Sequence, residues 1–396
     1  MGRVPHGAGK IWRVSVTNEL KTDEAYQRNG RRLYVFIALL LPGLLAFGLP
    51  AKAYTITDAD AIFSSYNKAF YFTNAEGGFF HATTDGGKTW FWERAEQMEM
   101  LLDVYERNTN AACLSMFTNV FNGFIADHGT NWNNNEFNDD IMWMVIACAR
   151  AHQLTGNPEF RDIARANFDM CYARAWSTNL GGGLWWKTSN LSKNACVNGP
   201  AAIAAYLLFQ IGGDTNYLTK AMGIYAWERR TLFDSQSGEV FDSIDDGGEV
   251  DPQIFTYNQG TFIGAANFLG FTNDAKLAAD FTVKKSGRNG IMPGYGQAGD
   301  GGGFNGICAR WLARFMKDRS LQGCYQKWLQ NNAEAAWEGR RQRDGLAWSR
   351  WSRPTPNGPL NSWACSSSVV VMQVVPPSNG GTISNPFNGQ ATTAEK

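Results

Sequence analysis

The sequence predicts an all-α protein built as an (α/α)6 barrel, a toroid of six inner and six outer helices. Three observations predict this fold. Six apolar helical segments recur along the chain with starts about 45 to 60 residues apart, each follows a Gly-rich loop or a turn, and a charged amphipathic segment lies in every interval. With 396 residues and 44% apolar content, the chain can bury the large core that such a ring needs.

The six apolar segments that follow these loops or turns are rich in Ala, Gly, Cys and Ser and carry few charges, as residues 198–206 illustrate. Small apolar residues on nearly all sides predict helices that are buried on several faces, so we assign these segments to the inner ring. They span residues 90–105, 137–152, 195–210, 257–269, 304–315 and 361–374.

The intervening segments carry charge on one side, as residues 159–166 do, which is typical of an outer helix with a solvated face. Periodicity does not prove that the ring closes, so an open solenoid or an irregular helical fold is the alternative. Two short patches, 77–80 and 183–186, are expected to form loop hairpins near the inner-helix ends. The outer segments span residues 62–70, 114–124, 159–175, 217–232, 274–285 and 321–337.

The N-terminal region predicts export. Arg31 and Arg32 precede the uncharged run 33–49, and Ala51-Lys52-Ala53 follows as a small-x-small cleavage site. We therefore expect a leader with a signal peptide over 1–53, cleavage after Ala53 and an extracellular location. An uncleaved membrane anchor is the alternative, because the run is at the short limit for a membrane span.

The remaining boundaries follow from composition. The (α/α)6 catalytic domain is expected over 54–375, and residues 376–396 are expected to be a disordered polar tail, because they contain almost no large apolar side chains. Once the signal is cleaved, no stable membrane insertion is expected.

Composition favours a neutral carbohydrate as the partner. The 36 basic residues balance the 36 acidic ones without long runs of one sign, so nucleic acid and anionic membranes are not expected partners. The chain also carries 15 Trp, 13 Tyr and 25 Phe beside 42 Gly. Aromatic rings stack on the apolar face of a sugar, although an aromatic-rich core explains the same counts.

Histidine and cysteine patterns predict neither a metal site nor a cofactor. The four histidines show no ligand spacing, and the seven cysteines include no Cys-x-x-Cys pair.

Two adjacent acids, Asp139 and Asp140, stand at the start of the inner segment 137–152. Carboxylates favour the first turn of a helix, which gives them an ordinary structural explanation. The apolar run 141–146 follows at once, however, and places them at a buried helix mouth, where ionised acids are unfavourable unless they are paired or used. They are therefore the candidate catalytic pair.

Further candidates surround this pair in the toroid. Trp185 and Trp186 are candidates for a sugar platform or for simple packing, and Asn258 and Gln259 open an inner helix, where they bind sugar hydroxyls or cap the helix. Three aspartates of the Gly-rich stretch 241–252 are expected to line the cleft, and the spacing of an EF-hand calcium loop is absent. These aspartates are Asp245, Asp246 and Asp251.

The sequence Asn138-Asp139-Asp140, followed by Trp143, resembles the signature of glycoside hydrolase family 76, the α-1,6-mannanases. Three more segments support the resemblance in the expected order and spacing: 181–186, 194–205 and 256–260. The likeness covers most of residues 60–375.

The resemblance implies an (α/α)6 barrel that acts with retention of configuration. Asp139 would be the nucleophile and Asp140 the general acid/base, with the helix start slightly irregular so that neighbouring carboxyl groups share one pocket. The matched motifs imply substrate contacts, and Arg310 follows from a looser match at 304–306. The implied substrate-binding residues are Asn138, Trp143, Trp185, Trp186, Tyr257, Asn258, Gln259 and Arg310.

Together these observations predict a secreted, retaining endo-α-1,6-mannanase that hydrolyses mannan or manno-oligosaccharides without a metal or cofactor. Two alternatives stay open at this stage. A mannan-directed transglycosidase would use the same residues, and a non-catalytic mannan-binding protein would use the same aromatic cleft.

Overall fold

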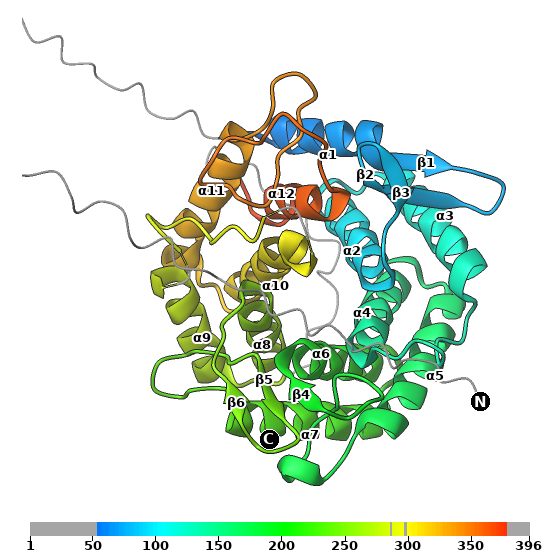
Figure 1. Ribbon diagram of the computed structural model, residues 1–396, viewed down its shortest axis with the longest axis vertical. Coiled ribbons are helices and arrows are strands. Elements are labelled where there is room, and N and C mark those ends of the chain that lie inside the picture. The colour runs from blue at the N-terminus through cyan, green and yellow to red at the C-terminus, as the bar shows by residue number, and fades with distance from the viewer. Residues whose placement is uncertain (1–53, 286, 297–298, 378–396) are drawn as a thin grey trace, which may run out of the picture. The chain divides into compact units, whose positions relative to one another are not determined.

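The computed structural model describes residues 54–285, 287–296 and 299–377. This part of the chain contains twelve α-helices in an inner and an outer ring (Figure 1), which confirms the predicted (α/α)6 fold. The inner helices are α2 (Phe91–Asn108), α4 (Asn138–Thr155), α6 (Ala195–Gly212), α8 (Thr256–Phe268), α10 (Phe304–Asp318) and α12 (Ser362–Val374). The outer helices are α1 (Ile56–Phe70), α3 (Ala111–His128), α5 (Pro158–Ala175), α7 (Thr215–Thr231), α9 (Thr272–Lys285) and α11 (Gln322–Glu338).

The inner ring is closed. Each inner helix packs against the next one along the chain, and α12 packs against α2 as well as α10. The first helix, α1, covers the last helix, α12, so the two ends of the domain complete the sixth helix pair. An open solenoid is therefore excluded for the described residues.

Small residues allow the inner helices to approach closely. A side chain at Gly199 of α6 would lie 2.7 Å from Thr261 of α8, and one at Gly260 would lie 2.6 Å from the Cα atom of Cys308. Among the described residues α6 is the one helix long and apolar enough to span a bilayer, yet 72% of it is buried within the protein. Its composition is that of a helix packed on all sides.

Local signals set the helix ends. Asn157 and Asp214 cap the outer helices α5 and α7, since each side chain accepts a hydrogen bond from a backbone N–H two residues on. The inner helices α4 and α6 end at Gly156 and Gly213, which adopt the left-handed conformation.

Two antiparallel three-stranded sheets lie in the loops between helices. The predicted hairpin patch 77–80 falls in the first sheet. The patch 183–186 lies in no strand, and Leu184 forms only an isolated bridge with Trp176. The sheets are β1 (Tyr71–Thr73), β2 (Gly78–Thr83) and β3 (Gly86–Lys88), then β4 (Ser192–Asn194), β5 (Ser243–Asp245) and β6 (Val250–Asp251); the 3-10 helices η1 (Asn179–Gly181) and η2 (Asp300–Gly303) complete the elements.

The predicted leader, residues 1–53, lies outside the described residues. The predicted tail does too, apart from Pro376 and Pro377.

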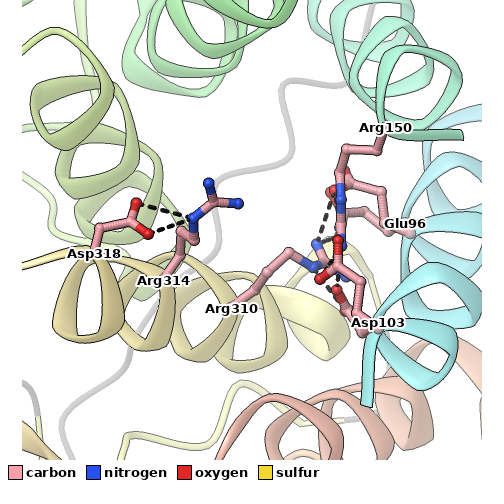
Figure 2. A network of polar contacts seen from close by, with 8 residues as sticks. Glu96, Asp103, Arg150, Arg310, Arg314 and Asp318 are labelled. Carbon is pink, nitrogen blue, oxygen red and sulfur yellow. Dashed lines mark hydrogen bonds and ion pairs between the residues drawn. The ribbon is translucent and has the colours of Figure 1, made fainter. Parts of the chain in front are cut away.

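A buried ion network joins three inner helices inside the ring (Figure 2). Arg310 of α10 contacts Glu96 at 2.6 Å and Asp103 at 2.8 Å, both on α2. Arg150 of α4 contacts Asp103 at 2.8 Å and Glu99 at 2.7 Å. Asp103 thus bridges the two arginines, and the network ties α2 to α4 and α10.

Burial controls the charge of this network. It raises the pKa of Glu96 to about 8, although the guanidinium of Arg310 acts in the opposite direction. Burial and the ion pair with Arg310 thus act on Glu96 in opposite directions.

We expect Arg310→Met to destabilise the fold by about 3–5 kcal/mol, because it leaves buried carboxyl groups without their partner. Arg314→Met on the same helix is the matched control. Its ion pair with Asp318 is partly exposed, so we expect a change of about 0–1 kcal/mol. Urea unfolding measures both free energies, and equal effects of the two substitutions would contradict a structural role for the network.

Candidate active site

Asp139 and Asp140 lie in the first turn of α4, where free backbone N–H groups favour negative charge. The preceding residue, Phe137, has an extended backbone and offers no side-chain cap. The helix is continuous from Asn138, so the irregular start that we expected is not observed. Both side chains are partly exposed, although most of their surroundings are protein atoms.

Asn138 fixes the start of α4 to the segment that contains Trp185 and Trp186. Its backbone N–H donates to the carbonyl oxygen of Trp186 at 2.8 Å, and its Nδ2 donates to that of Trp185 at 2.8 Å. Its Oδ1 accepts from Arg174 at 2.7 Å, and the residue is only 1% exposed. Asn138 therefore holds the backbone beside the acids rather than presenting its side chain to a ligand.

Arg174, at the end of outer helix α5, holds the loop that precedes the acids. Besides Asn138, its guanidinium donates to the carbonyl oxygens of Asn133 at 2.8 Å and Asn135 at 2.6 Å. Asn135 in turn donates from Nδ2 to the Oδ2 of Asp140 at 2.9 Å. Neither residue was predicted from the sequence, because Arg174 is more than thirty positions from the acids and stands in no motif, and the contact of Asn135 depends on the loop that Arg174 holds.

Asp139 has donors on one side and an unpaired oxygen on the other. The Sγ of Cys196 donates to its Oδ2 at 3.6 Å, whereas its Oδ1 is buried without a hydrogen-bond partner. The indole of Trp186 lies close enough to favour the charged form, and its own N–H is likewise buried without a partner of good geometry. The buried oxygen of Asp139 and the buried N–H of Trp186 therefore lie close to each other inside the protein.

Burial raises the pKa of Asp139 well above its ordinary value, and the neighbouring charge of Asp140 raises it further. Burial also raises the pKa of Asp140, to about 7, while Asn135 acts to lower it and Asp300 to raise it. Because the two carboxyl groups interact, they titrate as a pair. The pair therefore retains a proton near neutral pH.

Two more acids approach this pair. Burial is the main cause that raises the pKa of Glu93, on α2, to about 7, and Asp300 and Asp140 add to it. Asp300, in η2, also has a raised pKa because of burial. Acids in the first turns of α2, η2 and α4 therefore lie close to one another near the start of α4.

Aromatic side chains from five inner helices form a connected group beside the acids. Tyr257 stacks on Phe304 with ring centroids 3.8 Å apart, and Trp92 meets Trp363 edge-on at 4.6 Å. Trp143 lies between these pairs, 6.5 Å from Tyr257 and 6.3 Å from Trp92. Sequence analysis singled out Trp143 and Tyr257 but not the other three.

Tyr257 lies next to the candidate pair, since Asp139 and Cys196 contribute to raising the pKa of its phenol above the ordinary value, after burial. Tyr257 and Trp92 are partly exposed, whereas Trp143 is 1% exposed and packs beneath them. Cys196 stands where α6 begins and is much smaller than the aromatic residues of the other inner helices.

Asn258 is fully buried and donates from Nδ2 to Asp242 at 3.0 Å, while its Oδ1 has no partner. Burial raises the pKa of Asp242 to about 6. The sequence pattern pointed to other aspartates of this Gly-rich stretch and not to Asp242. It does not reveal that Asp242 contacts Asn258 at the start of α8.

Three predicted site residues have their polar groups or rings engaged in the protein. Gln259 is buried, accepts from the N–H of Val240 and donates to the carbonyl oxygen of Gly238. Arg310 lies two turns into α10 within the ion network of Figure 2. Trp185 is 5% exposed, with the ammonium group of Lys193 4.6 Å from its ring centre. The structure does not bring these three together with the acids.

The glycines before Leu184 are required by geometry. Gly182 and Gly183 have φ values of 126° and 82°, which side chains rarely adopt, and a side chain at Gly183 would lie 2.3 Å from the ring of Trp227. This tight approach lets the chain turn from α5 toward the acids, so that Trp186 lies near Asp139.

The described residues contain no group of three or more potential metal ligands.

Comparison with known proteins places this geometry in context. Residues 55–377 match the sequence profile described as Glycosyl hydrolase family 76. The fold is similar to that of the α-1,6-mannanase GH76A of Salegentibacter sp. HEL1_6, with a TM-score of 0.74 and 31% identity over 80% of this chain and 98% of that chain. An inactive variant of that mannanase, with two aspartates replaced by asparagine, was solved with α-1,6-mannotriose; its TM-score is 0.75 at 30% identity over the same shares.

More distant similarity extends to fungi. Dfg5 from Chaetomium thermophilum, solved with glucosamine, shares the fold with a TM-score of 0.70 at 14% identity, over 83% of this chain and 94% of that chain. The meiotically up-regulated gene 191 protein of Schizosaccharomyces pombe is 30% identical over 165 residues. That match spans 38% of this chain and 37% of the yeast protein.

Proposed function

Since the chain belongs to glycosyl hydrolase family 76, we propose that it hydrolyses α-1,6-mannosidic linkages within mannan, with Asp139 and Asp140 as the catalytic pair. The observation that carries the proposal is the pair itself: two carboxyl groups in one helix turn, with raised pKa values, beside a partly exposed aromatic group. The bacterial mannanase similar to this chain is inactive when two aspartates are replaced, and that variant binds α-1,6-mannotriose. These facts support a glycosidase that acts on the same linkage.

In the proposed first step, the carboxylate of Asp139 attacks the anomeric carbon and forms a glycosyl–enzyme bond, while the bond to the leaving O6 breaks. Asp140 transfers its proton to that oxygen. In the second step Asp140 takes a proton from water, the water oxygen attacks the anomeric carbon, and Asp139 is released as a carboxylate. The configuration is retained after two displacements.

The surroundings of each acid support this division of roles. Cys196 and Trp186 both favour the charged form of Asp139, which a nucleophile needs. Asp140 lies near Asp300, whose negative charge favours its protonated form, which a general acid needs. Burial and the charge of Asp140 raise the pKa of Asp139 more strongly than Trp186 and Cys196 lower it, so the division of roles follows the family and is tested by the substitutions of both acids.

The sugar would bind through stacking and hydrogen bonds. Tyr257, Trp92 and Trp186 offer partly exposed rings. The partly exposed carboxyl group of Asp242, which accepts from the Nδ2 of the buried Asn258, is a further group suited to sugar hydroxyls.

The place of action that we propose is outside the cell. The uncharged run 33–49 after Arg31 and Arg32 supports export, with cleavage after Ala53. N-terminal sequencing of the protein recovered from the culture medium of its natural host tests this point, and a protein that stays in the membrane fraction with its leader intact contradicts it.

We expect Asp140→Asn to lower kcat/KM on debranched α-1,6-mannan by about 10²–10⁴-fold, because the leaving oxygen is no longer protonated. A substrate with an activated aryl leaving group, which needs little protonation, should recover most of the lost rate. Asp139→Asn should lose at least as much activity and recover none with either substrate.

Product chromatography and initial rates measure both variants, with Asp162→Asn, an exposed acid on α5, as control. If the wild-type protein releases no short manno-oligosaccharides, the hydrolase proposal fails. Recovery of Asp139→Asn instead of Asp140→Asn would reverse the assigned roles.

The pH profile should respond in opposite directions to two substitutions. Asp140 must be protonated to act as the acid, so kcat/KM should fall as the pH rises through the higher pKa of the pair. Asn135→Ala removes a donor to the charged form, so this basic limb should move to higher pH. Asp300→Asn removes a negative charge, so the limb should move to lower pH.

Each shift should be roughly half a pH unit or more, which corresponds to about 0.7 kcal/mol. Shifts in the same direction, or none, would contradict Asp140 as the group that sets this limb.

A further inference from the structure

A cavity separate from the candidate catalytic pair lies beside the loop that leads to Trp185. Its volume is about 670 Å³, within the roughly 300–1,000 Å³ that is usual for sites that bind small molecules. Neither Asp139 nor Asp140 lines it. The lining residues are Arg174, Trp176, Ser177, Asn179, Leu180, Trp185, Asn190 and Asp246.

One wall of the cavity is held rigidly by a buried lysine. Lys193 is fully buried, and its Nζ donates to the carbonyl oxygens of Ser177 at 3.0 Å, Asn179 at 2.7 Å and Gly182 at 2.5 Å. A buried ammonium group is unfavourable without such acceptors, so the lysine and the loop fix each other. The wall is therefore formed before any ligand arrives.

Backbone strain is concentrated at the same place. Leu180 and Asn190 line the cavity and have φ values of 56° and 54°, a region that residues other than glycine rarely adopt. The strained carbonyl of Leu180 accepts from Trp227 at 3.0 Å, and that of Gly181 accepts from Arg230 at 2.9 Å. Strain that is held in this way is typical of ligand sites.

The chemistry of the lining suits a neutral sugar. Trp176 offers a partly exposed ring, the amides of Asn179 and Asn190 offer donors and acceptors, and the charges of Arg174 and Asp246 oppose each other. An ionic ligand would meet one group of its own sign, whereas sugar hydroxyls can use all of them. Leu191, 59% exposed beside Asn190, adds apolar surface near this rim.

We propose that this cavity is a second carbohydrate site, which binds a mannosyl segment of the polymer outside the active site. The inference rests on the function proposed above, because it takes the same substrate as ligand. Arg174 connects the two places, since it lines the cavity and also holds Asn135 and Asn138 beside the acids. A chain held here stays close to the catalytic pair, which raises its effective concentration there.

The test counts binding sites in the full-length chain. Asn190, Leu191 and Ser192 form an Asn-x-Ser glycosylation sequon. The Asp139→Asn/Asp140→Asn protein, produced without glycosylation so that Asn190 is unmodified, is titrated with α-1,6-mannotriose by calorimetry. We expect two sites per chain. Adding Asn179→Ala and Asp246→Ala should remove one site or weaken it by at least about tenfold. Adding Asp162→Ala, an exposed acid outside the cavity, should leave both sites.

A single site that these cavity substitutions leave unchanged would overturn the second site, while turnover of mannan by the wild type would keep the proposed function. Absence of binding together with absence of turnover would overturn the proposed function and the inference with it. In the otherwise wild-type enzyme, the cavity substitutions should raise the KM for polymeric mannan several-fold relative to the KM for a short substrate. Equal changes for both substrates would also overturn the inference.

Discussion

Arg174 donates hydrogen bonds to Asn133, Asn135 and Asn138 in the segment that precedes and starts α4, and the position of both candidate catalytic carboxylates depends on them. The outer ring therefore does more than cover the inner one. A guanidinium group suits this task because its planar donors reach several acceptors at fixed angles. The same contacts leave Asn135 with its amide directed at Asp140, so the geometry of the loop and the charge of the acid are set together.

The buried acids of the barrel fall into two groups, which differ in the residues that they contact. Deep in the barrel, the carboxyl groups of α2 meet Arg150 and Arg310, which makes them part of the framework. Near the helix starts, Glu93 and Asp140 both have another acid, Asp300, as an electrostatic neighbour. Burial without a cationic partner raises their pKa values toward neutral pH, which is the condition that proton transfer needs. The acids deep in the barrel thus stabilise the fold, whereas those near the helix starts are available for proton transfer.

The sequence predicted the fold well because inner helices are subject to a strict packing rule. Positions such as Gly199 and Gly260 must be small for the helices to touch, so the inner segments could be recognised by composition. The acid pair was predicted because it starts such a segment. Arg310 was misplaced for a related reason: it follows a helix start by two turns, which carries its side chain down into the barrel. Arg174 and Asp242 were missed because their roles come from contacts between distant segments.

The two neighbouring tryptophans show how local geometry limits what a motif can reveal. In an extended segment, successive side chains point to opposite sides. Trp186 lies by Asp139, and Trp185 packs under Lys193 at the edge of the separate cavity. A motif that looks like one aromatic platform is therefore divided between two places, and the glycines before it hold both in position. Because Asn138 bonds to the carbonyl oxygens of both tryptophans, any movement of this segment would reach the start of α4 directly.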